Sequence, residues 1–258
     1  MSTNEKNQDE KLISIALDIG EAMLRTGGEV TRVEDTISRI LSVYQFKKTN
    51  VFAVTSMIEV TAVTCGGATL TQTRRVNAYA TDLEKLDKLN TLSREICADP
   101  PPPGNIGSRL DDILAEKEEH PFISYAGSIM AASGFTVFFG GNLYDAAATA
   151  VLACVINFMN RKGIYKKDNQ LLYYLACSVV TGMLGNLLVM AGFGMHLDKI
   201  LIGCIMLTIP GIAITYAVRD MLVGEIITGL LRFAESLLIA ASIAGGYIFS
   251  SLIIGGFL

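Results

Sequence analysis

The feature that most constrains this chain is a series of long apolar runs that fills its second half. A helix rises about 1.5 Å per residue, so about 20 apolar residues are needed to cross a hydrocarbon core of about 30 Å. Five runs meet this requirement, at residues 122–141, 143–160, 171–194, 200–218 and 226–258. The sequence therefore predicts a membrane α-helical bundle of about five transmembrane helices.

Charged side chains are concentrated in the other half of the chain. Residues 1–120 contain 33 of the 46 charged side chains. This division indicates a water-facing segment followed by a lipid-facing one. The net charge of −4 gives no basic surface for nucleic acid, so we expect no nucleic-acid partner.

The water-facing half carries the patterns of a soluble α+β domain over residues 11–99. Apolar residues recur every three to four positions over residues 12–24 and 30–44, which predicts two helices. The period changes to two over residues 51–76, where Val, Thr and Ile are frequent and a small sheet is predicted. A further helix is predicted over residues 83–96.

Further patterns predict where the parts begin and end. Thr31–Glu34 and Thr81–Glu84 fit capping boxes at the starts of two helices. Residues 1–10 are polar and are expected to form a disordered leader. Residues 100–120 are interpreted as a proline-rich linker and an amphipathic juxtamembrane helix, and the transmembrane domain follows over residues 121–258.

The distribution of basic residues predicts the orientation in the membrane. Basic side chains crowd the loop at residues 161–167, after the second run, and Arg219 closes the fourth. The positive-inside rule then places the N-terminal domain in the cytoplasm and the C-terminus outside. The first apolar stretch is short and follows an acidic, polar leader, so no secretory signal is expected.

Nothing in the sequence favours catalysis. The five cysteines are scattered without CxxC spacing, the chain has two histidines, and the common hydrolase, nucleotide-binding and zinc-protease motifs are absent. We therefore expect no enzyme, no cofactor, no metal site and no disulfide. A membrane-anchored enzyme acting through the N-terminal domain, and a metabolite sensor, remain as rival interpretations.

The informative residues are the ionisable groups in or beside the apolar runs, because such groups are costly in a membrane. Asp145 starts the second run, where a helix-start carboxylate and an ion pathway are equally compatible. Arg219 and Asp220 close the fourth run, where interfacial placement is favoured over binding. Arg232 and Glu235 lie about one turn apart, as an ion pair or as a proton-titrating carboxylate beside a cation.

Pro210 and Gly211 stand near the middle of the fourth run. Proline removes a backbone hydrogen bond and clashes with the preceding turn, while glycine permits unusual dihedral angles. A harmless kink would explain the pair, but transporters place their substrate sites at helices broken near the membrane midplane. We therefore interpret the pair as the mark of a transporter.

Several of these segments together resemble the threonine/serine exporter family. The resemblance rests on residues 25–34, Arg74-Arg75-Val76, Phe139-Gly140-Gly141 with Asp145, Ile209-Pro210-Gly211, Arg219-Asp220, Gly224-Glu225 and Arg232 with Glu235. It covers residues 11–258, and the series from Pro210 to Glu225 is its most specific part.

The resemblance implies a subunit that exports small polar metabolites, driven by an ion gradient across a bacterial inner membrane. Threonine or serine is the first choice of substrate, and succinate or a similar dicarboxylate is the alternative. Single-chain members join such a half to a second half, so the chain is expected to be the large subunit of a two-component exporter. Its expected partner is a smaller membrane subunit of four or five spans, and self-association is also expected.

The resemblance also implies roles for the candidate residues. Asp145 and Glu235 are candidates for proton coupling, and Arg219 or Arg232 would engage a substrate carboxylate. The full set of pathway candidates is Asp145, Pro210, Gly211, Arg219, Asp220, Glu225, Arg232 and Glu235.

Overall fold

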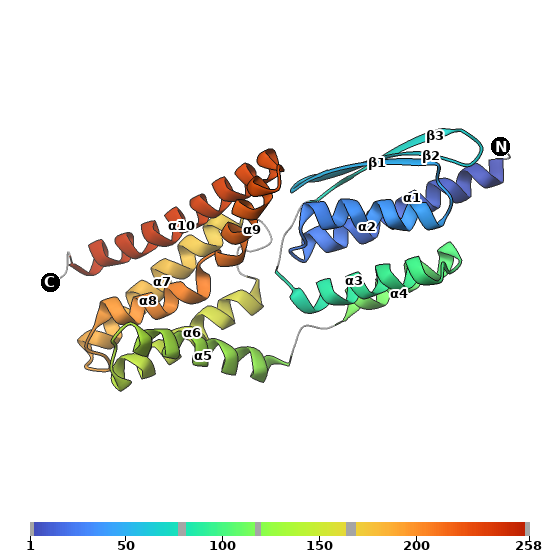
Figure 1. Cartoon of the computed structure of the whole chain (residues 1–258). Coiled ribbons are helices and arrows are strands. Elements are labelled where there is room, and N and C mark those ends of the chain that lie inside the picture. The colour runs from blue at the N-terminus through green and yellow to red at the C-terminus, as the bar shows by residue number, and fades with distance from the viewer. Residues whose placement is uncertain (1–2, 77–80, 117–119, 164–168, 256–258) are drawn as a thin grey trace. The chain divides into compact units, whose positions relative to one another are not determined.

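The computed structural model describes residues 3–76, 81–116, 120–163 and 169–255 (Figure 1). Two compact units are present. The first comprises Met1–Lys117 with Tyr216–Arg232, and the second comprises Glu118–Thr215 with Phe233–Leu258. The chain thus returns to the first unit near its end, which the predicted order of domains did not include.

The first unit combines four helices with a small sheet. Its elements, in order, are α1 (Thr3–Arg25), α2 (Val30–Val43), β1 (Lys48–Val54), β2 (Met57–Val63), β3 (Thr69–Arg75), α3 (Leu83–Ala98) and α4 (Pro103–Ala115). The strands are antiparallel in the order β1-β2-β3. The predicted small sheet is therefore present, and a turn with Gly67 in the left-handed region connects β2 and β3.

The core of this unit lies between the sheet and the helices. Helices α1 and α2 pack on the sheet, and α3 and α4 pack on these helices as a further layer (Figure 1). Strand β2 shows why one face is covered, since Ile58, Val60 and Ala62 are buried and the residues between them are not. Ile13, Ile37 and many other apolar side chains fill the space between the sheet and the helices.

Several local predictions for this unit differ from the structure. Helix α1 begins at Thr3, inside the segment expected to be a disordered leader, because this segment contains good helix formers. Helix α2 has Glu29 as its N-cap, so the capping box predicted at Thr31 is wrong. Glu34, its predicted acceptor, instead accepts a hydrogen bond from the backbone N–H of Ala53 at 2.7 Å.

The expected juxtamembrane helix is also part of the first unit. Helix α4 begins at Pro103, where proline is tolerated because the first turn lacks intrahelical acceptors. Its apolar residues Ile106 and Leu110 are buried in the core with α1 and α3. The amphipathic stripe is therefore satisfied by protein rather than by a membrane surface.

The second unit contains the apolar helices. They are α5 (Pro121–Phe138), α6 (Leu143–Lys162), α7 (Gln170–Met190), α8 (Leu197–Thr208), the first residues of α9 (Gly211–Leu222) and most of α10 (Ile226–Gly255). Four described helices, α5, α6, α7 and α10, are long and apolar enough to cross a membrane. A multi-pass membrane protein follows, as predicted.

The fourth predicted span is two helices rather than one. Helices α8 and α9 are separated by Ile209 and Pro210 and are bent by 55°. The count of spans is five if this pair forms one broken span. Thr208 ends α8 because Pro210 follows closely and cannot donate a backbone hydrogen bond.

Small residues allow the membrane helices to approach closely. A Cβ atom on Gly203 of α8 would collide with Thr136 Oγ1 and would lie 2.7 Å from the carbonyl of Ala132 in α5. A Cβ atom on Gly246 of α10 would lie 2.6 Å from Cβ of Ser178 in α7. Such contacts are typical of helix packing in membranes, where van der Waals contact replaces the hydrophobic effect as the driving force.

Candidate functional site

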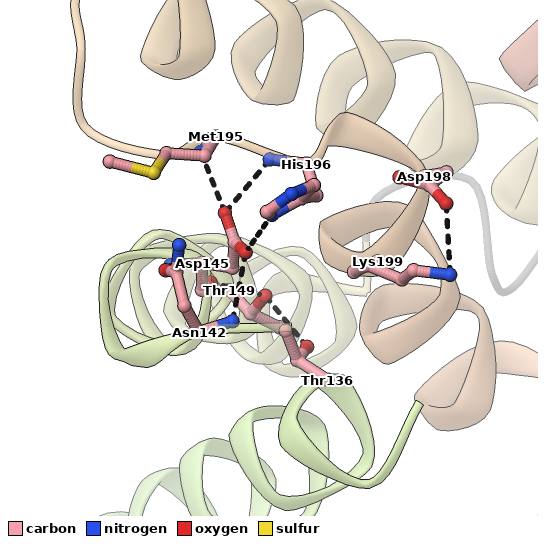
Figure 2. A network of polar contacts seen from close by, with 8 residues as sticks. All are labelled: Thr136, Asn142, Asp145, Thr149, Met195, His196, Asp198 and Lys199. Carbon is pink, nitrogen blue, oxygen red and sulfur yellow. Dashed lines mark hydrogen bonds and ion pairs between the residues drawn. The ribbon is translucent and has the colours of Figure 1, made fainter. Parts of the chain in front are cut away.

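Asp145 lies at the start of α6, where it joins two connections of the second unit. Its neighbours are Asn142, which precedes α6, and Met195 and His196, which precede α8 (Figure 2). The side chain of Asp145 is fully buried. These two connections therefore meet at the same end of the helices, as expected for consecutive helices that alternate in direction.

The carboxylate of Asp145 receives donors from both connections. Oδ1 accepts the backbone N–H groups of Met195 at 2.7 Å and His196 at 3.0 Å. Oδ2 accepts the N–H of Asn142 at 2.9 Å and lies 2.8 Å from Nδ1 of the His196 ring (Figure 2). Asn142 completes a reciprocal capping box, since its side chain accepts the N–H of Asp145 at 2.9 Å.

Hydroxyl groups continue this network into the helices. Thr149 donates to the carbonyl of Asp145 at 2.8 Å, and its Oγ1 lies 2.8 Å from Oγ1 of Thr136 in α5. Both threonines are fully buried, whereas the His196 side chain is about half exposed. Three backbone donors stabilise the ionised carboxylate, so the geometry favours Asp145 as a clamp over a group that releases and rebinds a proton.

A second cluster of charged residues lies in the first unit, where α9 turns into α10. Helix α9 ends in a Schellman motif, in which the N–H of Glu225 bonds to the carbonyl of Asp220 and that of Gly224 to Met221. Gly224 has φ of +100°, a conformation that disfavours other residues. The two helices approach closely, since a Cβ atom on Gly229 would lie 2.7 Å from the carbonyl of Ala217.

The turn places Asp220 against Arg232. Arg232 Nη1 lies 3.4 Å from Asp220 Oδ2, and both side chains are almost completely buried. The guanidinium of Arg232 also lies over the ring of Tyr216, 5.8 Å from its centroid. Asp220 Oδ2 forms no hydrogen bond among the described residues, so the ion pair is its main compensation.

The other candidates near this turn have different surroundings. Arg219 forms an ion pair with Glu29, at the N-terminus of α2, and is half exposed. Glu225 is half-buried and immediately precedes α10, where a carboxylate is favoured by the helix dipole. Glu235 lies one turn beyond Arg232 on α10, and its side chain is exposed on the surface of this chain.

Pro210 and Gly211 lie at the break between α8 and α9. Gly211 begins α9, and a Cβ atom added to it would meet no atom within 4 Å. Its neighbourhood is therefore open rather than packed. The break was expected from the sequence, and it is present.

The structure brings together part of the predicted set and adds residues to it. Asp220 and Arg232 are in contact, which the sequence did not suggest, because 12 positions separate them across a turn. The sequence analysis did not identify Tyr216 as a neighbour of Arg232 or His196 as a neighbour of Asp145. No group of three or more potential metal-binding side chains occurs in the described parts of the chain, and the five cysteines are free thiols.

Comparison with known proteins bears on the whole chain. A family model described as "Putative threonine/serine exporter" (ThrE) matches residues 14–254. No curated protein and no solved structure is significantly similar to the chain. The matched region covers most of both units and includes the break after α8 and both charged clusters. The chain therefore belongs to the threonine/serine exporter family.

Proposed function

We propose that this chain is a subunit of an ion-gradient-driven exporter of threonine, serine or a similar small polar metabolite. Two observations carry the proposal. One is the break between α8 and α9, and the other is the buried ion pair between Asp220 of α9 and Arg232 of α10. Broken helices free backbone groups for a polar substrate, and buried charges near membrane spans are costly unless they serve a function.

The chemistry of the pair suits a zwitterionic substrate. An amino acid carries one carboxylate and one ammonium group, so it can exchange partners with an arginine and an aspartate. At 3.4 Å without a hydrogen bond to Asp220 Oδ2, the pair is separable at lower cost than a bidentate one. Arg232 would then hold the substrate carboxylate, and Asp220 would hold the ammonium group or a coupling proton.

The remaining candidates have supporting roles in this proposal. Pro210 and Gly211 provide the bend, Arg219 links α9 to Glu29 at the start of α2, and Glu225 immediately precedes α10. Asp145 holds two connections of the second unit together, and Glu235 remains a candidate for proton coupling. Membership of an exporter family favours transport over catalysis in the N-terminal unit.

The proposed location is a bacterial inner membrane, with the N-terminal unit in the cytoplasm. Part of the basic loop that supports this orientation, residues 164–168, lies outside the described residues. Cysteines introduced at the exposed positions Lys162 and Phe193, in a cysteine-free background, test the orientation. An impermeant thiol reagent added to cells should label only the cysteine at position 193. Labelling of the cysteine at position 162 alone would show that the chain has the opposite orientation.

A second membrane subunit of four or five spans is part of the proposal. Only 11% of the residues of α5 are buried within this chain, which leaves a large surface of this helix for other helices or lipid. Two halves of opposite orientation would place a substrate site between them near the midplane. Affinity purification from the native host, with native mass spectrometry, should recover a complex heavier than this chain, and recovery of the chain alone would argue against a stable partner.

The export function is tested by deleting the chain in its native host. Cells loaded with labelled threonine, serine or succinate should retain at least one of them longer than the parent strain. Restoring the wild-type chain should restore efflux, and collapsing the ion gradient should abolish it. Equal efflux of all three substrates with and without the chain would contradict the proposal.

A further inference from the structure

A pocket of about 580 Å³ lies in the first unit, where α2 and α3 pack against each other. Its wall includes Thr31, Arg32, Asp35 and Arg39 from α2, and Asn90, Ser93, Arg94 and Cys97 from α3. Glu29 and Arg219 complete the charged part of the wall. None of the residues from α3 was identified as a candidate for the exporter's pathway.

The charges in this wall do not cancel. It contains four arginines and two carboxylates, a net charge of +2 on a chain whose net charge is −4. Two of the arginines are compensated inside the wall. Arg39 Nε bonds to both carboxylate oxygens of Asp35, at 2.8 and 2.9 Å, and Arg219 pairs with Glu29.

Arg32 and Arg94 are the uncompensated pair. Both are exposed, and neither forms an ion pair with any residue that the structure describes. They lie on different helices, α2 and α3, and both line the same pocket. Guanidinium groups bind carboxylate and phosphate oxygens in a bidentate manner, which makes this pair selective for a doubly negative molecule.

Other features of the wall fit a small ligand. Thr31, Asn90 and Ser93 add hydroxyl and amide groups, and the pocket has room for a metabolite of a few carbon atoms. We propose that the α2–α3 pocket binds a small dianionic metabolite, with Arg32 and Arg94 as its principal contacts. This site shares only Arg219 with the pathway residues proposed above, and its ligand need not be the exported substrate.

Cys97 provides a reporter inside the pocket. It is half-buried in the wall, whereas Cys65, outside the pocket, is exposed. Burial raises the pKa of the Cys97 thiol, so its alkylation is slow enough to follow at neutral pH. A bound anion should slow alkylation of Cys97 and leave Cys65 unchanged, which peptide mass spectrometry can measure at both sites in one sample.

The test uses the purified full-length chain with succinate, inorganic phosphate and the zwitterion serine as probes. We expect at least one of the two dianions to bind by calorimetry and to protect Cys97, and serine not to. Protection by succinate alone identifies a dicarboxylate site, and protection by phosphate alone identifies a phosphate-group site. Absence of binding and protection with both dianions would overturn the proposal.

Variants assign the binding to the two arginines. Arg32→Ala and Arg94→Ala should each weaken binding about tenfold, as expected for loss of a charge-assisted contact. Arg75→Ala is the matched control, since Arg75 is an exposed arginine of β3 outside the pocket. Unchanged affinity in the Arg32/Arg94 double variant, or an equal loss in Arg75→Ala, would show that the anion binds elsewhere or only through bulk charge.

Discussion

Arg232 lies 3.4 Å from Asp220 across the α9–α10 turn, and both side chains are buried. Removing one member takes away the opposite charge that the other faces, and breaking a buried ion pair in this way costs about 3–5 kcal/mol. Asp220→Asn and Arg232→Gln should therefore each lower the thermal stability of the purified chain more than the double variant does. Strictly additive losses in this cycle would show that the two residues are not coupled.

Transport by the same variants separates a structural role from a functional one. If the pair only compensates charge, the double variant should regain efflux together with stability. The proposed function instead predicts that the double variant is stable and inactive, because the substrate has lost both of its contacts.

The clamp at Asp145 predicts a specific loss of stability. In Asp145→Asn, one of the two side-chain oxygens becomes an NH₂ group, which cannot accept a hydrogen bond from a backbone N–H. At least one backbone donor among Asn142, Met195 and His196 then loses its acceptor in this buried carboxylate site, at a cost of about 1–3 kcal/mol. Thermal unfolding in detergent should show this loss, and Asp198→Asn, at an exposed carboxylate of α8, should leave stability almost unchanged. Equal effects of the two variants would contradict the clamp.

Close packing of α5 and α8 gives a test that does not involve charge. Gly203→Ala places a methyl group against Thr136 and the carbonyl of Ala132, so a loss of about 1–3 kcal/mol is expected. Gly134→Ala in α5 is the matched change, since a Cβ atom there meets nothing within 4 Å. That substitution should be neutral or slightly stabilising, because alanine favours a helix more than glycine does. Similar melting temperatures for the two variants would show that α5 and α8 are further apart.

A pH-dependent effect is expected at Glu34 in the first unit. Partial burial raises the pKa of its carboxyl group above the ordinary value of 4.5, the N–H of Ala53 offsets part of this, and Glu225 raises it further. A carboxyl group whose pKa is raised in the folded state stabilises that state below pH 4.5. This stabilisation is lost as the pH rises through the pKa of the folded state. Glu34→Gln removes the charge and keeps an acceptor for Ala53.

Relative to the wild type, Glu34→Gln should therefore gain stability at pH 7 and show little gain at pH 4. Denaturant unfolding at the two pH values measures the difference. A variant that is less stable at pH 7 would show that the ionised form of Glu34 is the stabilising one.

The sequence predicted the elements better than their ends and contacts. Apolar periodicity identified the helices and the small sheet, because burial of one face determines that pattern. It placed the start of α2 at residue 30, as observed, but missed Glu29 as the N-cap, because the Glu29 side chain makes no capping hydrogen bond that the sequence could signal. Helix α4 was expected as a juxtamembrane amphipathic helix, because its apolar stripe does not reveal that α1 and α3 cover it.

For the candidate sites, too, the sequence identified residues but not the contacts between them. Asp220, Arg232 and Asp145 could be selected from the sequence because charges in apolar runs are rare. Their partners could not, since Asp145 meets His196 across 51 positions and two connections. Spacing along one helix suggested Glu235 as a neighbour of Arg232, but it could not suggest the contact with Asp220, which depends on the turn at Gly224.

The most direct test of the exporter account is accumulation of substrate by inside-out membrane vesicles from the native host. These vesicles retain any partner subunit and allow an imposed ion gradient to drive transport inward. Vesicles with the wild-type chain should accumulate threonine, serine or succinate only when the gradient is present. Vesicles with the Asp220→Asn/Arg232→Gln chain in equal amount should not, whereas Gly134→Ala vesicles should. Equal accumulation by the double variant, or by vesicles that lack the chain, would contradict the account.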